Sequence, residues 1–564
     1  MSTANVLDTN RRRAQPQAAG APHHEISPGW RGSTLWASLA SSALLWAPFP
    51  PLDLWPLAWI APLGWLWLIR KDRLEGRRPY LVLWLAGFVF WMAALNWLRL
   101  PHWATSFGWV ALSIYLGLYL PAMVALSRVA VHRLRISIIL AAPIVWTGLE
   151  LLRGHLLGGF TMASLGHTQY HWLELIQIAD LVGAYGVGFV VMFAAACLAS
   201  ALPLGGRKPR LWPLLPMAGI ISAALIYGER RLDHPPGPQG PRVALIQGSI
   251  DTEMKHDPAM RERVFRQYFN LSLRAVDGKP DLIVWPETMY RDPLILGHPD
   301  TLIPAGAPWT IDDLNRSVRE SRRRLGELAH LLGCDLLLGI DVQDYTSHGL
   351  DRYNSAVYVS RDGHLRGRYD KSHPVMFGEY IPLADVFPWL YKLTPLAGGI
   401  RAGSTNVAFD LANTRLAASI CYETVLPQVI LGQIRRLAAI GQEPDILVNL
   451  TNSGWYWGSS ELEMHLVCDV FRAVECRKPL LVAANTGISA WIDGDGRIIA
   501  QGPKRANDVI MADVRLDPRI SLYARFGDWF AGICLVGCLF FAAAGLASTM
   551  RGRRLARAET ALSA

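Results

Sequence analysis

The sequence predicts a polytopic α-helical membrane domain of about eight transmembrane helices, joined to an extracytoplasmic α/β domain. Of its 564 residues, 51% are hydrophobic and only 18% are charged, whereas a soluble domain carries roughly 25% charged residues. Long apolar stretches crowd the first part of the chain, and short apolar runs alternate with helical patterns farther on. This composition excludes a disordered chain and a small disulfide scaffold.

Eight stretches have the composition of membrane spans, for which about 20 mostly apolar residues are needed. The expected spans are Ser33–Ala47, Leu54–Ile69, Tyr80–Leu98, Gly108–Ser127, Ile136–Leu152, Gly183–Leu202, Leu211–Gly228 and Trp529–Ser548. The first two are short and are interrupted by Pro48 and Pro56. The first seven define a transmembrane domain at residues 33–228, and the eighth stands alone at residues 529–548.

Lysine and arginine collect in every second connection between these spans. They occur at Arg11–Arg13, Arg70–Arg78, Arg128–Arg135, Arg207–Arg210 and Arg551–Arg557. Such residues are enriched on the cytoplasmic side, so a disordered N-terminus (1–32) and a C-terminal tail (549–564) are both expected in the cytoplasm. The net charge of +9 then reflects membrane topology, and no nucleic-acid partner is expected.

Residues 241–515 predict a layered α/β domain that lies outside the cytoplasm. The expected buried strands are Arg242–Gly248, Asp281–Glu287, Cys334–Ile340, Arg415–Glu423, Asp445–Asn452 and Pro479–Gly487. Helical patterns occupy Thr310–Leu332 and Glu461–Glu475, and the turns Ser360–Gly363 and Asp493–Gly496 predict hairpins. This length and alternation favour a two-sheet sandwich flanked by helices.

Three polar residues stand at the ends of apolar strand patterns. Glu287 ends IVWPE, Lys371 follows the strand after the first hairpin turn, and Cys421 ends LAASIC. Each one alone has an ordinary explanation, as a turn residue, a solvated lysine or a small buried thiol. Together with their flanking residues, however, the three residues indicate a catalytic site.

The flanking segments VWPET, RYDKSHPVMFGEYIP and SICYE match the three motifs of the nitrilase superfamily in order and spacing. This resemblance implies an αββα sandwich. Seven spans before that domain and one after it resemble the arrangement in the apolipoprotein N-acyltransferases, the membrane-embedded family of this superfamily. The segments ELLRG, SLGHTQ and NTGISAWIDGDGR are also similar to that family, so the resemblance extends from about Ser33 to Ser548.

The resemblance implies a Glu-Lys-Cys triad. Cys421 would be the nucleophile that forms a thioester, since a thiolate splits one acyl transfer into two steps. Glu287 would be the general acid and base. Lys371 would stabilise the tetrahedral oxyanion together with the backbone N–H of Tyr422. Glu379 matches the second glutamate of the family and would orient Lys371 or assist proton movement.

Other residues near the triad are predicted to hold the nucleophile loop or to contact the substrate. Glu423, in the Cys-Tyr-Glu segment, is expected to hold the nucleophile loop. The segment Val375–Leu396, which includes Met376 and Phe377, is either a lid at the membrane interface or ordinary core packing. Trp455 raises the same two alternatives. These aromatic and apolar residues are the candidates for contact with substrate.

The sequence also departs from the family pattern. Ser453 stands where an aspartate is common, which puts the positioning of its loop in doubt, and Met289 replaces a smaller residue beside Glu287. Cys468 and Cys476 lie eight residues apart and are interpreted as structural. The sequence contains no C-x-x-C pair, phosphate-binding loop or dinucleotide motif, so neither a metal nor a cofactor is expected.

Family resemblance implies that the acyl donor is a phospholipid and that the acceptor is the free amine of an S-diacylglyceryl cysteine at an apolipoprotein N-terminus. The expected location is the bacterial inner membrane, with the catalytic domain on the periplasmic side. A monomer is expected, because no self-pairing surface is evident.

Three alternative functions were compared with the same sequence features. A membrane-tethered amidase or nitrilase would use the same triad with water as acceptor. A transporter with an outer sensing domain would place ionisable residues well inside the spans, but Glu150 and Asp180 lie at span edges. A catalytically inactive scaffold would not need all three triad residues.

Overall fold

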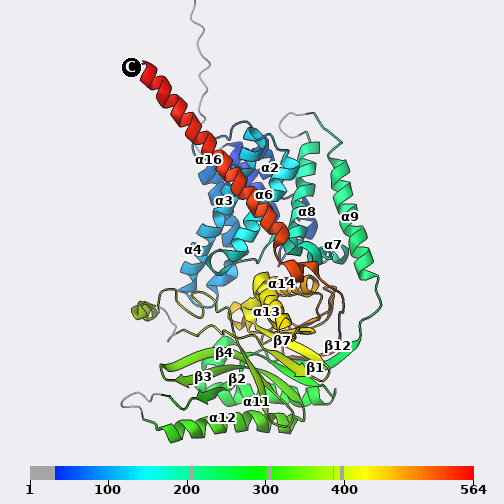
Figure 1. Cartoon of the computed structure of the whole chain (residues 1–564), viewed down its shortest axis with the longest axis vertical. Coiled ribbons are helices and arrows are strands. Elements are labelled where there is room, and N and C mark those ends of the chain that lie inside the picture. Colours follow the sequence, from blue (N-terminus) through cyan, green and yellow to red (C-terminus); the bar gives the residue numbers. More distant parts are fainter. Residues whose placement is uncertain (1–31, 204–207, 302–307, 385, 394–398, 564) are drawn as a thin grey trace, which may run out of the picture.

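The computed structural model describes residues 32–203, 208–301, 308–384, 386–393 and 399–563. It contains a helical part and an α/β part, which lie one above the other (Figure 1). Residues 1–31 of the predicted disordered N-terminus (1–32) lie outside the described residues, as do position 385 and positions 394–396 of the predicted lid.

The helical part is built from both ends of the chain. Its helices are α1 (Ser33–Trp46), α2 (Leu63–Arg70), α3 (Pro79–Ala94), α4 (Thr105–Gly117), α5 (Tyr119–Arg128), α6 (Ile138–His155), α7 (Leu173–Ile176), α8 (Ala179–Ala201), α9 (Leu214–Leu232) and α16 (Trp529–Ser563). The last helix packs against α6, so the C-terminal segment returns to the N-terminal bundle (Figure 1).

Among the described residues, three helical stretches are long and apolar enough to cross a membrane. They are Thr105–Arg133, Ala179–Ala201 and Trp529–Arg551. The expected span Leu54–Ile69 is divided between a 3-10 turn and α2, because Pro56 and Pro62 limit helix continuity. The last helix continues beyond the expected end at Ser548, to Ser563.

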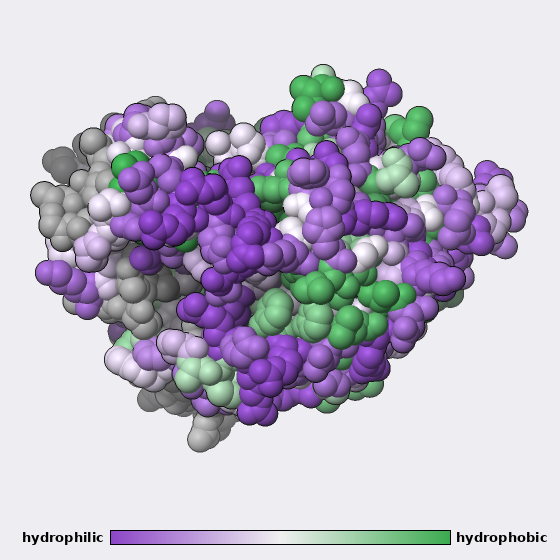
Figure 2. Space-filling model, turned by 90° about the horizontal axis from the view of Figure 1, so that it is seen from below, coloured by the Kyte–Doolittle hydropathy of each residue, from purple (hydrophilic) through white to green (hydrophobic). Residues whose placement is uncertain are grey.

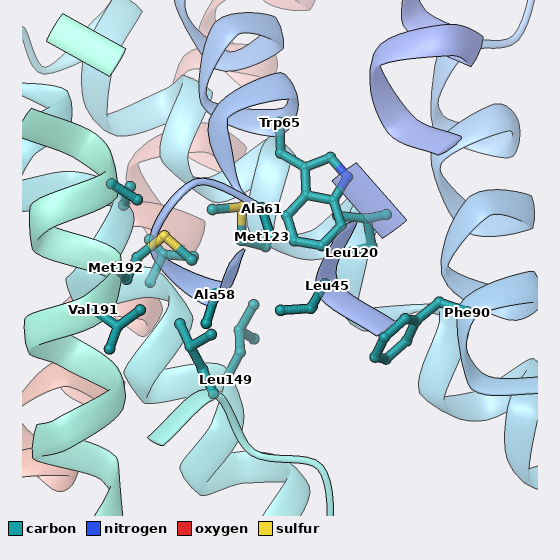
Figure 3. Close-up of a cluster of buried hydrophobic side chains, with 14 of the residues drawn as sticks. Leu45, Ala58, Ala61, Trp65, Phe90, Leu120, Met123, Leu149, Val191 and Met192 are labelled. Atoms are coloured by element: carbon teal, nitrogen blue, oxygen red, sulfur yellow. The ribbon is translucent and has the colours of Figure 1, made fainter. Parts of the chain in front are cut away.

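Large apolar side chains fill the interior of the helical part. Figure 3 shows Leu45, Trp65, Leu120, Leu149 and Met192 converging from α1, α2, α5, α6 and α8. α3 and α4 approach each other closely at Gly87, since a Cβ there would lie 2.8 Å from the Gly117 carbonyl oxygen. Small residues permit this close helix packing in membranes.

The α/β part is a sandwich of two six-stranded sheets. One sheet has the order β12-β1-β2-β3-β4-β5 and the other β11-β10-β9-β8-β7-β6. The strands are β1 (Gln239–Gln247), β2 (Leu282–Gly297), β3 (Asp335–Thr346), β4 (Gly349–Val359), β5 (Leu365–Asp370), β6 (Ala408–Leu411), β7 (Thr414–Ile420), β8 (Ile446–Thr451), β9 (Leu480–Ala484), β10 (Ala490–Ile492), β11 (Ile498–Gln501) and β12 (Asp508–Arg515).

Helices cover both outer faces of the sandwich. They are α10 (Thr252–His256), α11 (Arg261–Val276), α12 (Ile311–Leu332), α13 (Pro427–Ala439), α14 (Glu461–Cys476) and α15 (Leu522–Phe526). α11 and α12 pack on the first sheet, whereas α13 and α14 lie between the second sheet and the helical part (Figure 1). The face seen from below in Figure 2 is mainly hydrophilic, and its broadest hydrophobic area lies right of the centre of the view.

The predicted strands and the two predicted helices of this part are present within a few residues of their expected limits, and both hairpin turns join antiparallel strands. Three predicted strand ends are wrong. β3 does not end at Ile340 but continues to Thr346. β7 ends at Ile420, because Cys421 has a φ of 51°, which a strand does not accommodate. β2 does not end at Glu287 but continues to Gly297, with register shifts between Trp285 and Tyr290.

Candidate active site

Lys371 lies at the centre of a buried cluster of charges. It directly follows β5 and is 1% exposed. Its Nζ donates to Glu379 Oε1 at 2.8 Å and lies 3.4 Å from Glu287 Oε1. Burial alone would lower the pKa of Lys371, but the charges of Glu379 and Glu287 hold this pKa well above its ordinary value. The lysine therefore keeps its positive charge inside the protein.

Glu287 projects from the irregular stretch of β2, where the chain departs from regular pairing with β3. Gly339 on β3 permits this geometry, because a Cβ there would lie 2.2 Å from the Pro286 carbonyl oxygen. Asn354 Nδ2, on β4, donates to Glu287 Oε1 at 2.6 Å and lies 3.4 Å from Glu379 Oε1. Sequence reasoning missed Asn354, because β4 also carries Asp351, Arg352 and Ser355 and the sequence does not single out one polar residue among them.

Cys421 occupies the turn at the end of β7. Its carbonyl oxygen accepts a hydrogen bond from Asn449 Nδ2 at 3.1 Å, which ties the turn to β8. Burial raises the pKa of the Cys421 thiol and the charge of Glu287 raises it further, while Lys371 opposes the shift. The resting thiol is therefore protonated at neutral pH and needs a base before it can react.

Glu423 connects the cysteine turn to the segment that follows Lys371. Its buried carboxylate accepts hydrogen bonds from both elements. The donors are Tyr369 Oη (2.8 Å), Ser372 N (2.7 Å), Ser372 Oγ (2.7 Å), His373 N (3.0 Å) and Ile420 N (2.7 Å). One side chain thus fixes the elements that carry Cys421 and Lys371 relative to each other.

The site lies where the α/β part meets the helical part. Tyr422 Oη donates to the Gly159 carbonyl oxygen at 2.9 Å, and Gln428 Nε2 donates to that of Gly154 at 2.7 Å. His373 Nε2 lies 2.9 Å from the Gly158 carbonyl oxygen. These contacts hold the nucleophile turn, the start of α13 and the lysine segment against the end of α6 and the connection that follows it.

The candidate substrate-contacting residues have different environments. Phe377 is 64% exposed, whereas Met376 is half-buried near Gly158 of the helical part. Farther along the same segment, Trp389 is 55% exposed. Trp455 is half-buried in the 3-10 turn Ser453–Tyr456. The segment after Lys371 therefore presents apolar side chains to its surroundings instead of burying all of them in a core.

The structure shows the surroundings of Met289 and Ser453, the two residues that depart from the family pattern. Met289 is fully buried among the side chains between the first sheet and α11. Ser453 is buried and lies beside the Glu461 carboxyl, whose pKa it helps to lower. Burial raises the pKa of Glu461 to about 7. The loop therefore retains a neighbouring carboxyl group although its own aspartate is absent.

Cys468 and Cys476 are both buried in α14 and form no disulfide with each other. Cys468 packs beside His167 of the helical part, with 3.9 Å between Sγ and Nδ1. Their environment fits the structural role predicted for them.

Two family models match the chain, one over the helical part and one over the α/β part. Residues 41–197 match the apolipoprotein N-acyltransferase N-terminal domain, and residues 242–522 match the carbon-nitrogen hydrolase family. The fold and the site thus define a carbon-nitrogen hydrolase domain carried on a helical part with membrane-length helices.

Full-length relatives identify the family within this class. The chain is 34% identical to an apolipoprotein N-acyltransferase of Geobacter metallireducens over 522 residues, covering 90% of this chain and 94% of that protein. It is 31% identical to the Rhodopirellula baltica apolipoprotein N-acyltransferase, with 88% and 95% covered. The chain belongs to the apolipoprotein N-acyltransferase family.

Solved structures give a more distant comparison. An amidase from Nesterenkonia sp. AN1 matches at 15% identity and a TM-score of 0.35, covering 52% of this chain and 99% of that chain.

Proposed function

We propose that this protein transfers an acyl chain from a phospholipid to the N-terminal amine of S-diacylglyceryl-cysteine in apolipoproteins. The observation that carries the proposal is the buried ammonium of Lys371 between two carboxylates, whose charges act on the Cys421 thiol in its positive-φ turn. Membership of the family supplies the substrate classes. The reaction completes the maturation of a lipoprotein.

In the first half-reaction, the sulfur of Cys421 attacks the sn-1 ester carbonyl of the phospholipid. Glu287 takes the thiol proton, and Lys371 stabilises the oxyanion together with the backbone N–H of Tyr422. The C–S bond forms and the ester C–O bond breaks. Glu287 returns the proton to the leaving glycerol oxygen, so the products are an acyl thioester and a lysophospholipid.

In the second half-reaction, the free amine of the acceptor attacks the thioester carbonyl. Glu287 accepts a proton from the amine, the C–N bond forms and the C–S bond breaks. The thiolate recovers a proton through Glu287, so the thiol is regenerated. Glu379 positions Lys371 in both steps, because its carboxylate is the nearest one to Nζ. No metal or cofactor takes part in this scheme.

The proposed membrane arrangement follows the lysine and arginine distribution. Eight spans place both termini in the cytoplasm and the catalytic domain, residues 241–515, on the periplasmic side of the inner membrane. The exposed apolar side chains of Phe377 and Trp389 support contact between the segment 375–396 and the membrane interface. The protein acts as a monomer in this proposal.

Trapping the acyl-enzyme tests the proposal. Purified full-length protein in detergent, incubated with radiolabelled phospholipid, should acquire label that hydroxylamine releases. Cys421→Ala and Cys421→Ser should acquire none, and Glu287→Gln should lose most of it, because its amide cannot take the thiol proton. Cys334→Ala, which removes another buried thiol of the same domain, should label normally. Labelling of the Cys421 variants at the wild-type level contradicts the proposed nucleophile.

The choice of acceptor separates this function from a membrane-tethered amidase. The labelled enzyme should pass its acyl chain to the amine of a diacylglyceryl lipopeptide, which mass spectrometry detects as an amide. Release of free fatty acid with no amide product, together with ammonia release from small amides, would instead identify a hydrolase.

A further inference from the structure

A second buried lysine lies beside the triad and has no part in the mechanism above. Lys255, in α10, is 7% exposed, and its Nζ donates to the hydroxyl of Thr288, the residue after Glu287. No carboxylate oxygen of the described residues lies within 4.0 Å of this nitrogen. Burial lowers the pKa of Lys255, while the charges of Glu287 and Asp341 and the Cys421 thiol act in the opposite direction. A buried cation without a close counter-charge is costly unless a ligand supplies one.

Arg291 adds a second cation at the same edge of the site. It lies on β2, four positions beyond Glu287, and is half-buried without an ion pair to any described residue. Its positive charge acts on Lys255, so the two cations repel each other. The neighbouring Asp292 is already engaged by Arg261 and Arg324.

Asp341 is an acid whose charge acts on both cations. It is exposed, and it stands opposite Asn354 in the β3–β4 pairing, the residue whose amide contacts Glu287. Its charge acts on both Lys255 and Arg291 without forming a close ion pair with either. Glu287 also acts on Lys255 and Asp292 on Arg291, but among the described residues neither cation forms a close ion pair, so each can still accept an anionic partner.

Two hydrogen-bonding groups without a described partner lie on or next to α10. Thr252 Oγ1, one turn before Lys255, is buried without a hydrogen-bond partner, as is Asn452 Nδ2. A Cβ on Gly454 would lie 3.2 Å from Thr252 Oγ1 and 3.1 Å from Asn452 Oδ1, so these two side chains meet at one point. A hydroxyl and an amide N–H₂ are both able to donate to an anionic oxygen.

We propose that Lys255 and Arg291 form an anion subsite that binds the phosphodiester of the glycerophospholipid donor. This inference rests on the proposed function. The sn-1 ester and the phosphate are attached to the same glycerol, so an ester carbonyl placed on Cys421 brings the phosphate close to the thiol. Lysine and arginine are the side chains that bind such oxygens best, through charge-assisted hydrogen bonds. The subsite acts only in the first half-reaction, because the phosphate leaves with the lysophospholipid.

Two donors test the subsite. Thioester formation on the full-length enzyme is measured with phosphatidylglycerol and with p-nitrophenyl palmitate, a neutral ester without phosphate, in the same detergent. Lys255→Met and Arg291→Gln should each slow acylation by phosphatidylglycerol roughly tenfold or more, since each loses a charged hydrogen bond. Acylation by the neutral ester should stay within about twofold of wild type. Arg263→Gln, an exposed arginine on α11, is the matched control and should change neither rate.

The outcomes separate the subsite from the function on which it rests. Equal slowing with both donors means that these residues act by supporting the Glu287 loop, and the subsite is rejected. Wild-type rates with phosphatidylglycerol in both variants also reject it, while leaving the proposed function intact. Wild-type enzyme that accepts the neutral ester but no phospholipid contradicts the proposed function itself. Arg291→Gln, at a half-buried position, keeps the test valid if Lys255→Met fails to fold.

Discussion

At the scale of single residues, the charge of Lys371 depends on Glu379. Two carboxylates hold the pKa of Lys371 well above its ordinary value against the effect of burial. Glu379→Gln removes the nearer charge, so that pKa should fall and Lys371 should lose its proton as pH rises. We expect thioester formation to slow by roughly one to two orders of magnitude. Its loss at alkaline pH should begin at a lower pH than in wild type.

The measurement is the rate of thioester formation between about pH 7 and pH 10. Glu443→Gln serves as control, because Glu443 is an exposed carboxylate that pairs with Lys478 on the surface. An alkaline limb at the same pH in the Glu379 variant and the wild type would show that Glu379 does not set the charge of Lys371.

At the scale of elements, the turn after β7 depends on Glu423. Five donors from two segments converge on its carboxylate. Glu423→Gln removes the charge and turns an amide N–H₂ toward those donors, so unfolding should become easier by about 3 kcal/mol. Thermal unfolding in detergent, followed by tryptophan fluorescence, measures this change. Thioester formation should also fall sharply, because the Cys421 turn and the Lys371 segment lose their connection.

Glu327→Gln, on the exposed face of α12, is the control and should leave the unfolding midpoint almost unchanged. A Glu423 variant as stable and as active as this control would mean that the turn is held by other contacts.

The elements also show where sequence patterns are informative. Apolar runs predict β1, β3, β8 and β9 because buried strands need continuous hydrophobic residues. The same pattern overextends β7, since LAASICYE does not reveal that Cys421 adopts a positive φ. Local patterns predict that Glu287, Lys371 and Cys421 lie at strand ends, but they do not reveal which side chains on other strands contact them. Asn354 and Lys255 belong to strands and helices whose spatial neighbours are set by tertiary packing.

At the scale of the whole molecule, a buried ion-pair network joins the helical part to the α/β part. Arg477, directly after α14, is fully buried and contacts Asp180 of α8 at 2.8 Å and Asp495 at 3.3 Å. It also donates to the side-chain oxygen of Gln177 at 2.7 Å. The network therefore ties the end of α14 in the α/β part to α8 and the segment before it in the helical part.

Arg477→Met should therefore destabilise the whole protein and not the catalytic domain alone. Removing the cation leaves Asp180 and Asp495 buried with less compensation, which costs about 3–5 kcal/mol for a broken buried pair. The control Arg415→Met breaks an exposed pair with Asp410 and should cost less than about 1 kcal/mol. Thermal unfolding in detergent compares the two variants, and limited proteolysis locates the loosened junction. An unfolding midpoint of Arg477→Met equal to that of the control would show that apolar packing between α8 and α14 is sufficient to hold the two parts together.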